Sequence, residues 1–167
     1  MAFRPAFDSS RRGPGGFLAA CALLAALALF ATLPAQAAQP LEFLGLKEAL
    51  AKSKAEGKFT VLYFWTSSCP YCRYLDAEVL TDPGVVGDLN QSFVMVSLDK
   101  DRERELASRF RVNSVPRLIF LDSQGEPATV LPGAAEPALF RLFLAFVATN
   151  TYRDMEFDEF FDLVLEK

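Results

Sequence analysis

The sequence predicts a single α/β domain, because segments with the pattern of buried strands alternate along the chain with segments of helical periodicity. Two runs rich in β-branched and aromatic residues, 59–65 and 93–98, are typical of strands buried on both faces. A length of 167 residues suits one ordinary domain with short accessories. The hydrophobic fraction of 51% indicates that this domain has a packed core.

Four elements are predicted in the first half of the domain. The first is a helix over 46–55, which Gly57 can end. The strand at 59–65 comes next and stops at three polar residues, and a helix over 69–80 follows it. An Asp-Pro pair, suited to an N-cap and the first helical position, then opens a short helix over 82–90.

The second half continues the same alternation. The strand at 93–98 is followed by a charged surface helix over 101–110. Two further strands, 117–121 and 128–131, flank a polar turn and form a hairpin. A Glu-Pro pair opens a helix over 136–147. No internal repeat or long linker interrupts this order, which indicates one domain.

The last predicted element is an additional helix with an apolar stripe. Phe157, Phe160, Phe161 and Val164 recur at the spacing i, i+3, i+4, i+7 in an otherwise acidic segment. We expect the stripe to pack on the sheet or on a neighbouring helix, and a surface for a partner protein is the alternative.

The N-terminus has the pattern of a cleavable export signal rather than of the fold. Arginines precede an apolar run of 15 residues at 17–31, and a small-x-small tripeptide follows, ending at Ala37. The run is short for a membrane span. We therefore predict a signal peptide over 1–37 and a mature domain over 38–167. An uncleaved membrane anchor and lipid attachment at Cys21 are the alternatives.

The composition excludes several functions. A formal net charge of −4 argues against nucleic-acid binding, which requires clustered Lys and Arg. The chain contains no histidine, so it lacks the commonest general base and the commonest transition-metal ligand. No glycine-rich nicotinamide or flavin motif is present either. We therefore expect no bound cofactor, and any redox chemistry would use the cysteines of the chain itself.

Cleavage after Ala37 would leave only two cysteines, Cys69 and Cys72, in a C-x-x-C arrangement. A zinc site would need two further ligands, and the mature chain has no histidine or third cysteine to supply them. A disulfide between them would stabilise the fold only weakly, because closing a four-residue loop removes little entropy from the unfolded chain. The pair therefore predicts dithiol chemistry.

The position of the motif suits that chemistry. Cys69 is predicted at the N-terminus of a helix, where free N–H groups and the helix dipole stabilise a thiolate. It would attack a partner disulfide, and Cys72, one turn further on, would resolve the mixed disulfide. Pro70 fits the first turn because its missing N–H costs nothing there. Trp65, four residues earlier, either shields the motif or fills the core.

Phe64-Trp65 before Cys69-Pro70-Tyr71-Cys72, together with Ser114-Val115-Pro116 ahead of a strand, resembles the thioredoxin superfamily. The resemblance covers about 46–147. It implies a thioredoxin-like fold, with a central mixed β-sheet of about four strands flanked by helices. The apolar stripe described above adds an extra C-terminal helix over 151–167. The resemblance also implies that Pro116 is cis and, with Val115, binds the extended backbone of a substrate.

A narrower resemblance points to exported reductases. The stretch 78–85 is similar to the C-terminal domain of the membrane thiol:disulfide interchange protein, and the last helix is similar to thioredoxins associated with sulfur oxidation. These resemblances imply a monomeric, periplasmic or otherwise exported reductase of protein disulfides. Its substrate would be a cytochrome c precursor or a sulfur-carrier protein, and a membrane thiol donor would supply electrons. A disulfide-forming oxidase and a non-enzymatic binding or chaperone module are the alternatives.

The sequence departs from thioredoxin at two places. Tyr63 stands where thioredoxins carry a buried Asp that assists proton transfer to the second cysteine, and Met95 stands near the position of its Lys partner. Water, Tyr63 or a partner's side chain could then take the proton from Cys72. The dipeptide Pro70-Tyr71 resembles glutaredoxins, so we expect a couple somewhat more oxidising than that of thioredoxin.

Overall fold

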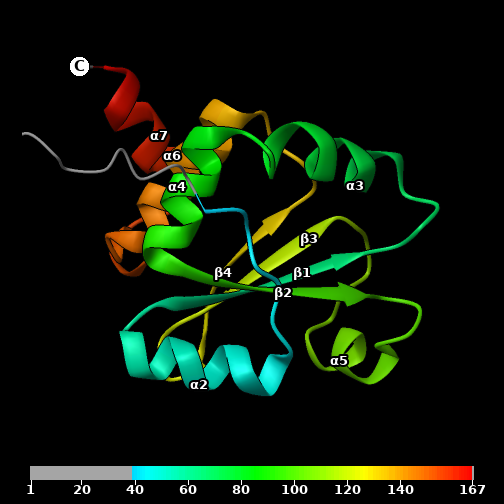
Figure 1. Cartoon of the computed structure of the whole chain (residues 1–167). Helices are drawn as coiled ribbons and strands as arrows, with labels where there is room; N and C mark the ends of the chain where they lie inside the picture. The colour runs from blue at the N-terminus through cyan, green and yellow to red at the C-terminus, as the bar shows by residue number, and fades with distance from the viewer. Residues whose placement is uncertain (1–38, 167) are drawn as a thin grey trace, which may run out of the picture. The chain divides into compact units, whose positions relative to one another are not determined.

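The computed structural model describes residues 39–166, in which a four-stranded mixed β-sheet carries helices on both faces (Figure 1). The predicted cleavage site and Cys21 lie outside the described residues. The strands are β1 (Phe59–Trp65), β2 (Phe93–Asp99), β3 (Arg117–Leu121) and β4 (Pro127–Pro132). The helices are α2 (Leu46–Glu56), α3 (Pro70–Tyr74), η1 (Leu75–Val79), α4 (Pro83–Ser92), α5 (Arg104–Arg109), α6 (Pro137–Ala148), η2 (Thr151–Arg153) and α7 (Phe157–Leu165).

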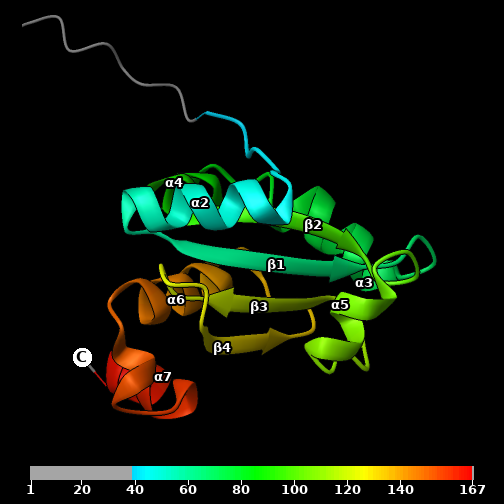
Figure 2. The same ribbon diagram turned by 90° about the horizontal axis from the view of Figure 1, so that it is seen from below.

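The strand order β2-β1-β3-β4 places β1 inside the sheet (Figure 2). β1 runs parallel to β2 and antiparallel to β3, which in turn pairs antiparallel with β4. Six of the seven residues of β1 are buried, which explains why its sequence lacks polar alternation. The predicted mixed sheet, the flanking helices and the additional C-terminal helix are confirmed.

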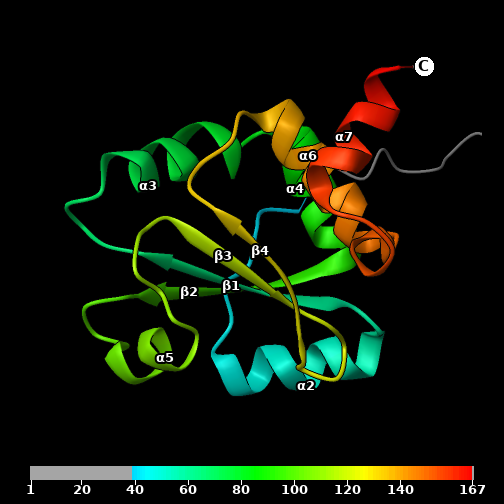
Figure 3. The ribbon, with the colours of Figure 1, turned by 180° about the vertical axis from the view of Figure 1, so that it is seen from behind.

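Helices cover both faces of the sheet (Figure 3), and each face buries a separate core. Alternate side chains of each strand point to opposite faces. Tyr63 and Phe120 pack on the face covered by α3, η1, α4 and α6, whereas Phe64 and Ile119 pack on the face covered by α2 and α5. Both faces of β1 are therefore shielded from water.

Two helices differ from their predicted form. The helix predicted over 69–80 contains a π-helical turn, η1, in which the Leu80 N–H donates to the Leu75 carbonyl at 2.9 Å. Leu75 and Val79, at the two ends of this turn, are both fully buried. The helix predicted over 101–110 begins at Arg104 instead, because the carboxylate of Asp99 accepts from the Asp101 N–H and holds the preceding residues in a turn.

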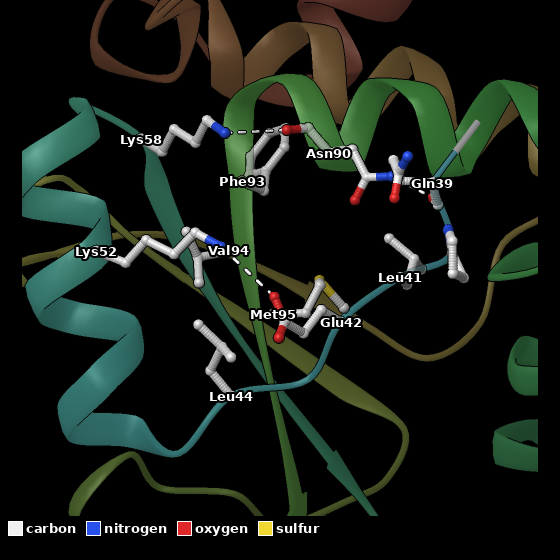
Figure 4. Close-up of a pocket in the computed structure, with 11 residues that line it drawn as sticks. Gln39, Leu41, Glu42, Leu44, Lys52, Lys58, Asn90, Phe93, Val94 and Met95 are labelled. Atoms are coloured by element: carbon white, nitrogen blue, oxygen red, sulfur yellow. Dashed lines mark hydrogen bonds and ion pairs between the residues drawn. The ribbon is translucent and has the colours of Figure 1, made fainter. Parts of the chain in front are cut away.

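Both edges of the sheet are protected. β4 begins and ends with proline, which cannot donate to another strand. The segment 39–44 lies along β2 (Figure 4). Here the Leu44 N–H donates to the Met95 carbonyl at 2.9 Å. A hollow between this segment and α2 is flanked by Lys52 and Lys58, and Lys58 donates to the Asn90 carbonyl at 3.1 Å.

Phe157 and Phe160 of the predicted apolar stripe pack on α6, whereas the ring of Phe161 adjoins that of Phe157 and Val164 is exposed. The rings of Phe157 and Phe143 lie 4.9 Å apart, and those of Phe160 and Phe146 lie 5.4 Å apart. None of the helices in the described part of the chain is long and apolar enough to span a bilayer.

Replacing Phe157 with alanine tests the attachment of α7. Because the ring is half-buried between Phe143 and Phe146, its loss is expected to lower the free energy of unfolding by about 1–2 kcal/mol. Urea denaturation measures this change. Leu163, on the same helix but 48% exposed, is the matched control, and Leu163→Ala should change stability by less than about 0.5 kcal/mol. Equal effects of the two variants would contradict this packing.

Candidate active site

The C-x-x-C motif lies where the central strand ends. β1 stops at Trp65, a turn of four residues follows, and α3 begins at Pro70 (Figure 1). The Cys69 N–H donates to the Thr66 carbonyl at 3.2 Å and closes this turn. Because β1 is held from both sides in the sheet, the motif occupies a rigid position at the carboxyl end of the strand.

Cys69 and Cys72 are joined by a disulfide, with their Cα atoms 5.3 Å apart. Cys69 is the N-cap of α3, and its sulfur accepts a hydrogen bond from the Cys72 N–H at 3.0 Å. Such a contact, together with the helix dipole, stabilises negative charge on the first sulfur. Cys69 is 7% exposed and Cys72 only 1%. A partner can therefore reach the first cysteine more easily than the second.

The two residues between the cysteines differ in exposure. Pro70 occupies the first position of α3, where a missing N–H breaks no hydrogen bond. The Tyr71 side chain is 69% exposed, which places an aromatic ring on the surface beside the disulfide. A large exposed aromatic next to a reactive bond is suited to contact a partner protein.

Trp65 is fixed before the motif by polar contacts. Its indole N–H donates to the Ser97 hydroxyl on β2 at 2.8 Å, and its carbonyl accepts from the Lys100 N–H at 2.9 Å. The ring is half-buried and packs against the core on the α3 face. It therefore contributes to the core and also borders the motif.

Val115 and Pro116 lie at the same end of the sheet. The peptide bond between them is cis. Phe64 pairs with Arg117 across β1 and β3, so Pro116 lies directly before β3 and close to the end of β1. Pro116 is buried and its carbonyl accepts from the Gly133 N–H at 2.9 Å, whereas Val115 is half-buried. Their role in binding a substrate stays a prediction.

A phenol and a carboxyl group adjoin the second cysteine. Tyr63 is buried under α3, and its hydroxyl donates to the Cys72 carbonyl at 3.4 Å. Burial, and then the charge of Asp76, raise the pKa of Tyr63 well above its ordinary value. Desolvation also raises the pKa of Asp76, and the neighbouring Tyr63 hydroxyl partly offsets this. Asp76 was not predicted as a site residue, although its spacing of four residues from Cys72 is that of neighbours along a helix.

A family model described as a thioredoxin-like domain matches residues 46–148. The chain is 33% identical over 91 residues to the thiol:disulfide interchange protein DsbD 2 of Pseudomonas aeruginosa, an alignment that covers 53% of this chain and 15% of that protein. The chain thus spans only a small part of the length of this curated relative.

Solved structures of thioredoxin-like proteins also superpose on this chain. A thioredoxin from Thermus thermophilus superposes with a TM-score of 0.60 and 34% identity, covering 65% of this chain and 88% of that one. The reduced C-terminal domain of Neisseria meningitidis DsbD superposes with a TM-score of 0.52 over 60% of this chain and 91% of that one. At 20% identity, the latter similarity concerns the fold alone.

The contact between Trp65 and Ser97 generates a prediction. Trp65 is the only tryptophan of the chain, so its fluorescence reports on this site alone. Ser97→Ala removes the hydrogen bond and should increase quenching of the emission by acrylamide, at a cost of up to about 1 kcal/mol of stability. Ser108→Ala, an exposed serine on α5, is the control and should leave quenching unchanged. Unaltered quenching in Ser97→Ala would show that packing alone holds the ring.

Proposed function

Because the chain belongs to the family of thioredoxin-like domains, we propose that it is an exported thiol–disulfide oxidoreductase that reduces the disulfides of other proteins. Its C-x-x-C disulfide supports thiol–disulfide exchange in general. The observation that carries the proposal is the hydrogen bond to the Cys69 sulfur at the start of α3, because it favours a thiolate on the accessible cysteine.

In the proposed reaction the Cys69 thiolate attacks one sulfur of a substrate disulfide. A bond forms from Cys69 to that sulfur, and the other substrate sulfur leaves as a thiolate. The Cys72 thiolate then attacks Cys69 and releases the second substrate sulfur. The substrate leaves as a dithiol, and the protein is left with the disulfide between Cys69 and Cys72. A second dithiol must reduce it before the next cycle.

The surroundings of the disulfide support a protein as substrate. Tyr71 presents an exposed aromatic ring, and the loop carrying Val115 and Pro116 lies at the same end of the sheet. We propose that Val115 and Pro116 bind an extended substrate segment while its disulfide meets Cys69. The overall negative charge makes an acidic nucleic acid an unsuitable partner.

We propose the direction of transfer and the location from the named relatives and from the predicted signal peptide. Similarity to a thiol:disulfide interchange protein supports exchange with a membrane thiol donor, and the predicted signal peptide supports a periplasmic location. We propose that the protein acts as a monomer. A cytochrome c precursor or a sulfur-carrier protein is the proposed substrate, and neither is favoured by a contact in the structure.

Serine substitutions of the two cysteines test this function. Cys69→Ser should reduce catalysed reduction of insulin by dithiothreitol to the uncatalysed rate, because no nucleophile remains at the helix start. Cys72→Ser should instead accumulate a covalent adduct with the substrate, visible by non-reducing electrophoresis, because Cys69 still attacks but nothing resolves the product. Full activity of Cys69→Ser in this assay would favour a binding module with a vestigial cysteine pair.

A further inference from the structure

We propose that a positively charged hollow near the disulfide binds an acidic segment of the protein that is reduced. The hollow lies between the turn that follows β2 and the C-terminal end of α5. This inference rests on the proposed thiol–disulfide exchange and adds a substrate class to it, namely proteins whose disulfide is flanked by Asp or Glu. The residues of the hollow select substrates and take no part in the bond changes.

Basic residues are concentrated in one stretch of an acidic chain. The whole sequence has 17 Lys and Arg against 21 Asp and Glu, but residues 100–117 have six against three. The six basic residues are Lys100, Arg102, Arg104, Arg109, Arg111 and Arg117. The last helix, α7, has three acidic residues and no basic one, and it lies away from α5 in Figures 1 and 2. Positive charge is therefore gathered around α5.

Three of these cations line a single hollow of about 460 Å³, which is room for more than one side chain. The charged residues of its wall are Lys100, Asp101, Arg104 and Arg111. Within the described residues none of the three cations pairs with a carboxylate, whereas the neighbouring Arg102 pairs with Asp99 at 3.4 Å. Because an Arg without an internal ion pair keeps donors free for a carboxylate, the hollow is suited to an anionic side chain.

The backbone holds two of these side chains in place. The Nε of Arg104 donates to the Asp101 carbonyl at 3.0 Å, which orients the guanidinium. Arg111 has a φ of 54°, in the left-handed region that favours glycine, and its N–H donates to the Ser108 carbonyl at 3.0 Å where α5 ends. Glycine would relieve this strain but would remove the charge. Retention of Arg at this position agrees with a role in binding.

The hollow lies at the same end of the sheet as the disulfide. β1 and β2 run parallel, so the C-x-x-C motif and Lys100, which follow them, leave the sheet at the same end. The Lys100 N–H donates to the carbonyl of Trp65, four residues before Cys69, at 2.9 Å. Asn113, also in the wall of the hollow, comes two residues before Val115. A substrate segment that lies across Val115 can therefore extend from Cys69 toward the hollow.

Arg117 extends the positive region toward the cis peptide bond. It follows Pro116 directly, and Ile119, two residues later on β3, packs in the core on the face covered by α2 and α5. Side chains two residues apart on a strand share a face, so Arg117 lies on the face of the sheet that carries α5 and the hollow. Its charge adds to the positive region between Pro116 and the hollow.

A short acidic segment fits these charges better than a long polyanion does. The positive region is confined to one end of the sheet, and the rest of the chain is acidic and repels an extended chain of phosphates. Exposed ion pairs contribute little to stability in water. We therefore expect the hollow to act on the rate of encounter and on the choice of substrate rather than on the exchange reaction itself.

Two matched peptides test the inference. Each contains one intramolecular disulfide, flanked on both sides by glutamates in the first peptide and by glutamines in the second. The rate constant for reduction by the fully reduced protein is measured by acid quenching and chromatography. The glutamate peptide should react about fivefold faster or more at about 20 mM salt, and lose most of this advantage at about 0.5 M, because ions screen exposed charges.

Variants of the hollow locate the effect. Arg104→Gln and Arg111→Gly should each slow reduction of the glutamate peptide by roughly threefold or more, and leave that of the glutamine peptide within about twofold. Because glycine adopts a positive φ without strain, Arg111→Gly should not lower the urea midpoint, so a lost preference is not a result of unfolding. Arg109→Gln removes the same charge from α5 outside the hollow and should retain the preference.

Equal rates for the two peptides with the wild-type protein overturn the inference. A preference that survives both Arg104→Gln and Arg111→Gly also overturns it, as does one that Arg109→Gln lowers equally, since diffuse charge then accounts for it. Reduction of neither peptide by the wild-type protein would instead overturn the proposed function.

Discussion

The hydrogen bond from the Cys72 N–H to the Cys69 sulfur, 3.0 Å long, fixes the first cysteine at the point where β1 has ended and α3 begins. A sulfur atom in this position lies at the positive end of the helix dipole and accepts a backbone N–H, and both favour its ionised form. The second cysteine lies one turn further on and is almost fully buried. The different exposure of two chemically identical residues gives them different roles in the proposed reaction.

The sheet maintains this geometry. β1 is buried on both faces and paired on both edges, so the end of the strand cannot move independently of the core. Parallel pairing with β2 brings Ser97 to Trp65, and antiparallel pairing with β3 brings Pro116 to the same end. Elements far apart in the sequence therefore meet around the disulfide because of strand direction and register alone. The cores on the two faces provide the rigidity that a preorganised site requires.

Much of this arrangement could be predicted from local patterns. The strand predicted over 59–65 has the same bounds as β1. It could be recognised because a strand buried on both faces has a distinctive composition. The π-helical turn at Leu75–Val79 could not be predicted, because one extra residue in a short helix leaves almost no trace in its periodicity. The contact of the Tyr63 hydroxyl with the Cys72 carbonyl depends on how α3 packs over β1, which no local pattern specifies. Cleavage after Ala37 stays a prediction.

The midpoint potential of the Cys69–Cys72 couple, measured by equilibrating the protein over 38–167 with glutathione buffers, tests the proposed reductase most directly. We expect a value between about −270 and −220 mV, that is, a reducing couple slightly more oxidising than thioredoxin. A value near about −120 mV would mean that the reduced form is strongly stabilised. It would contradict the reductase and indicate a disulfide-forming oxidase.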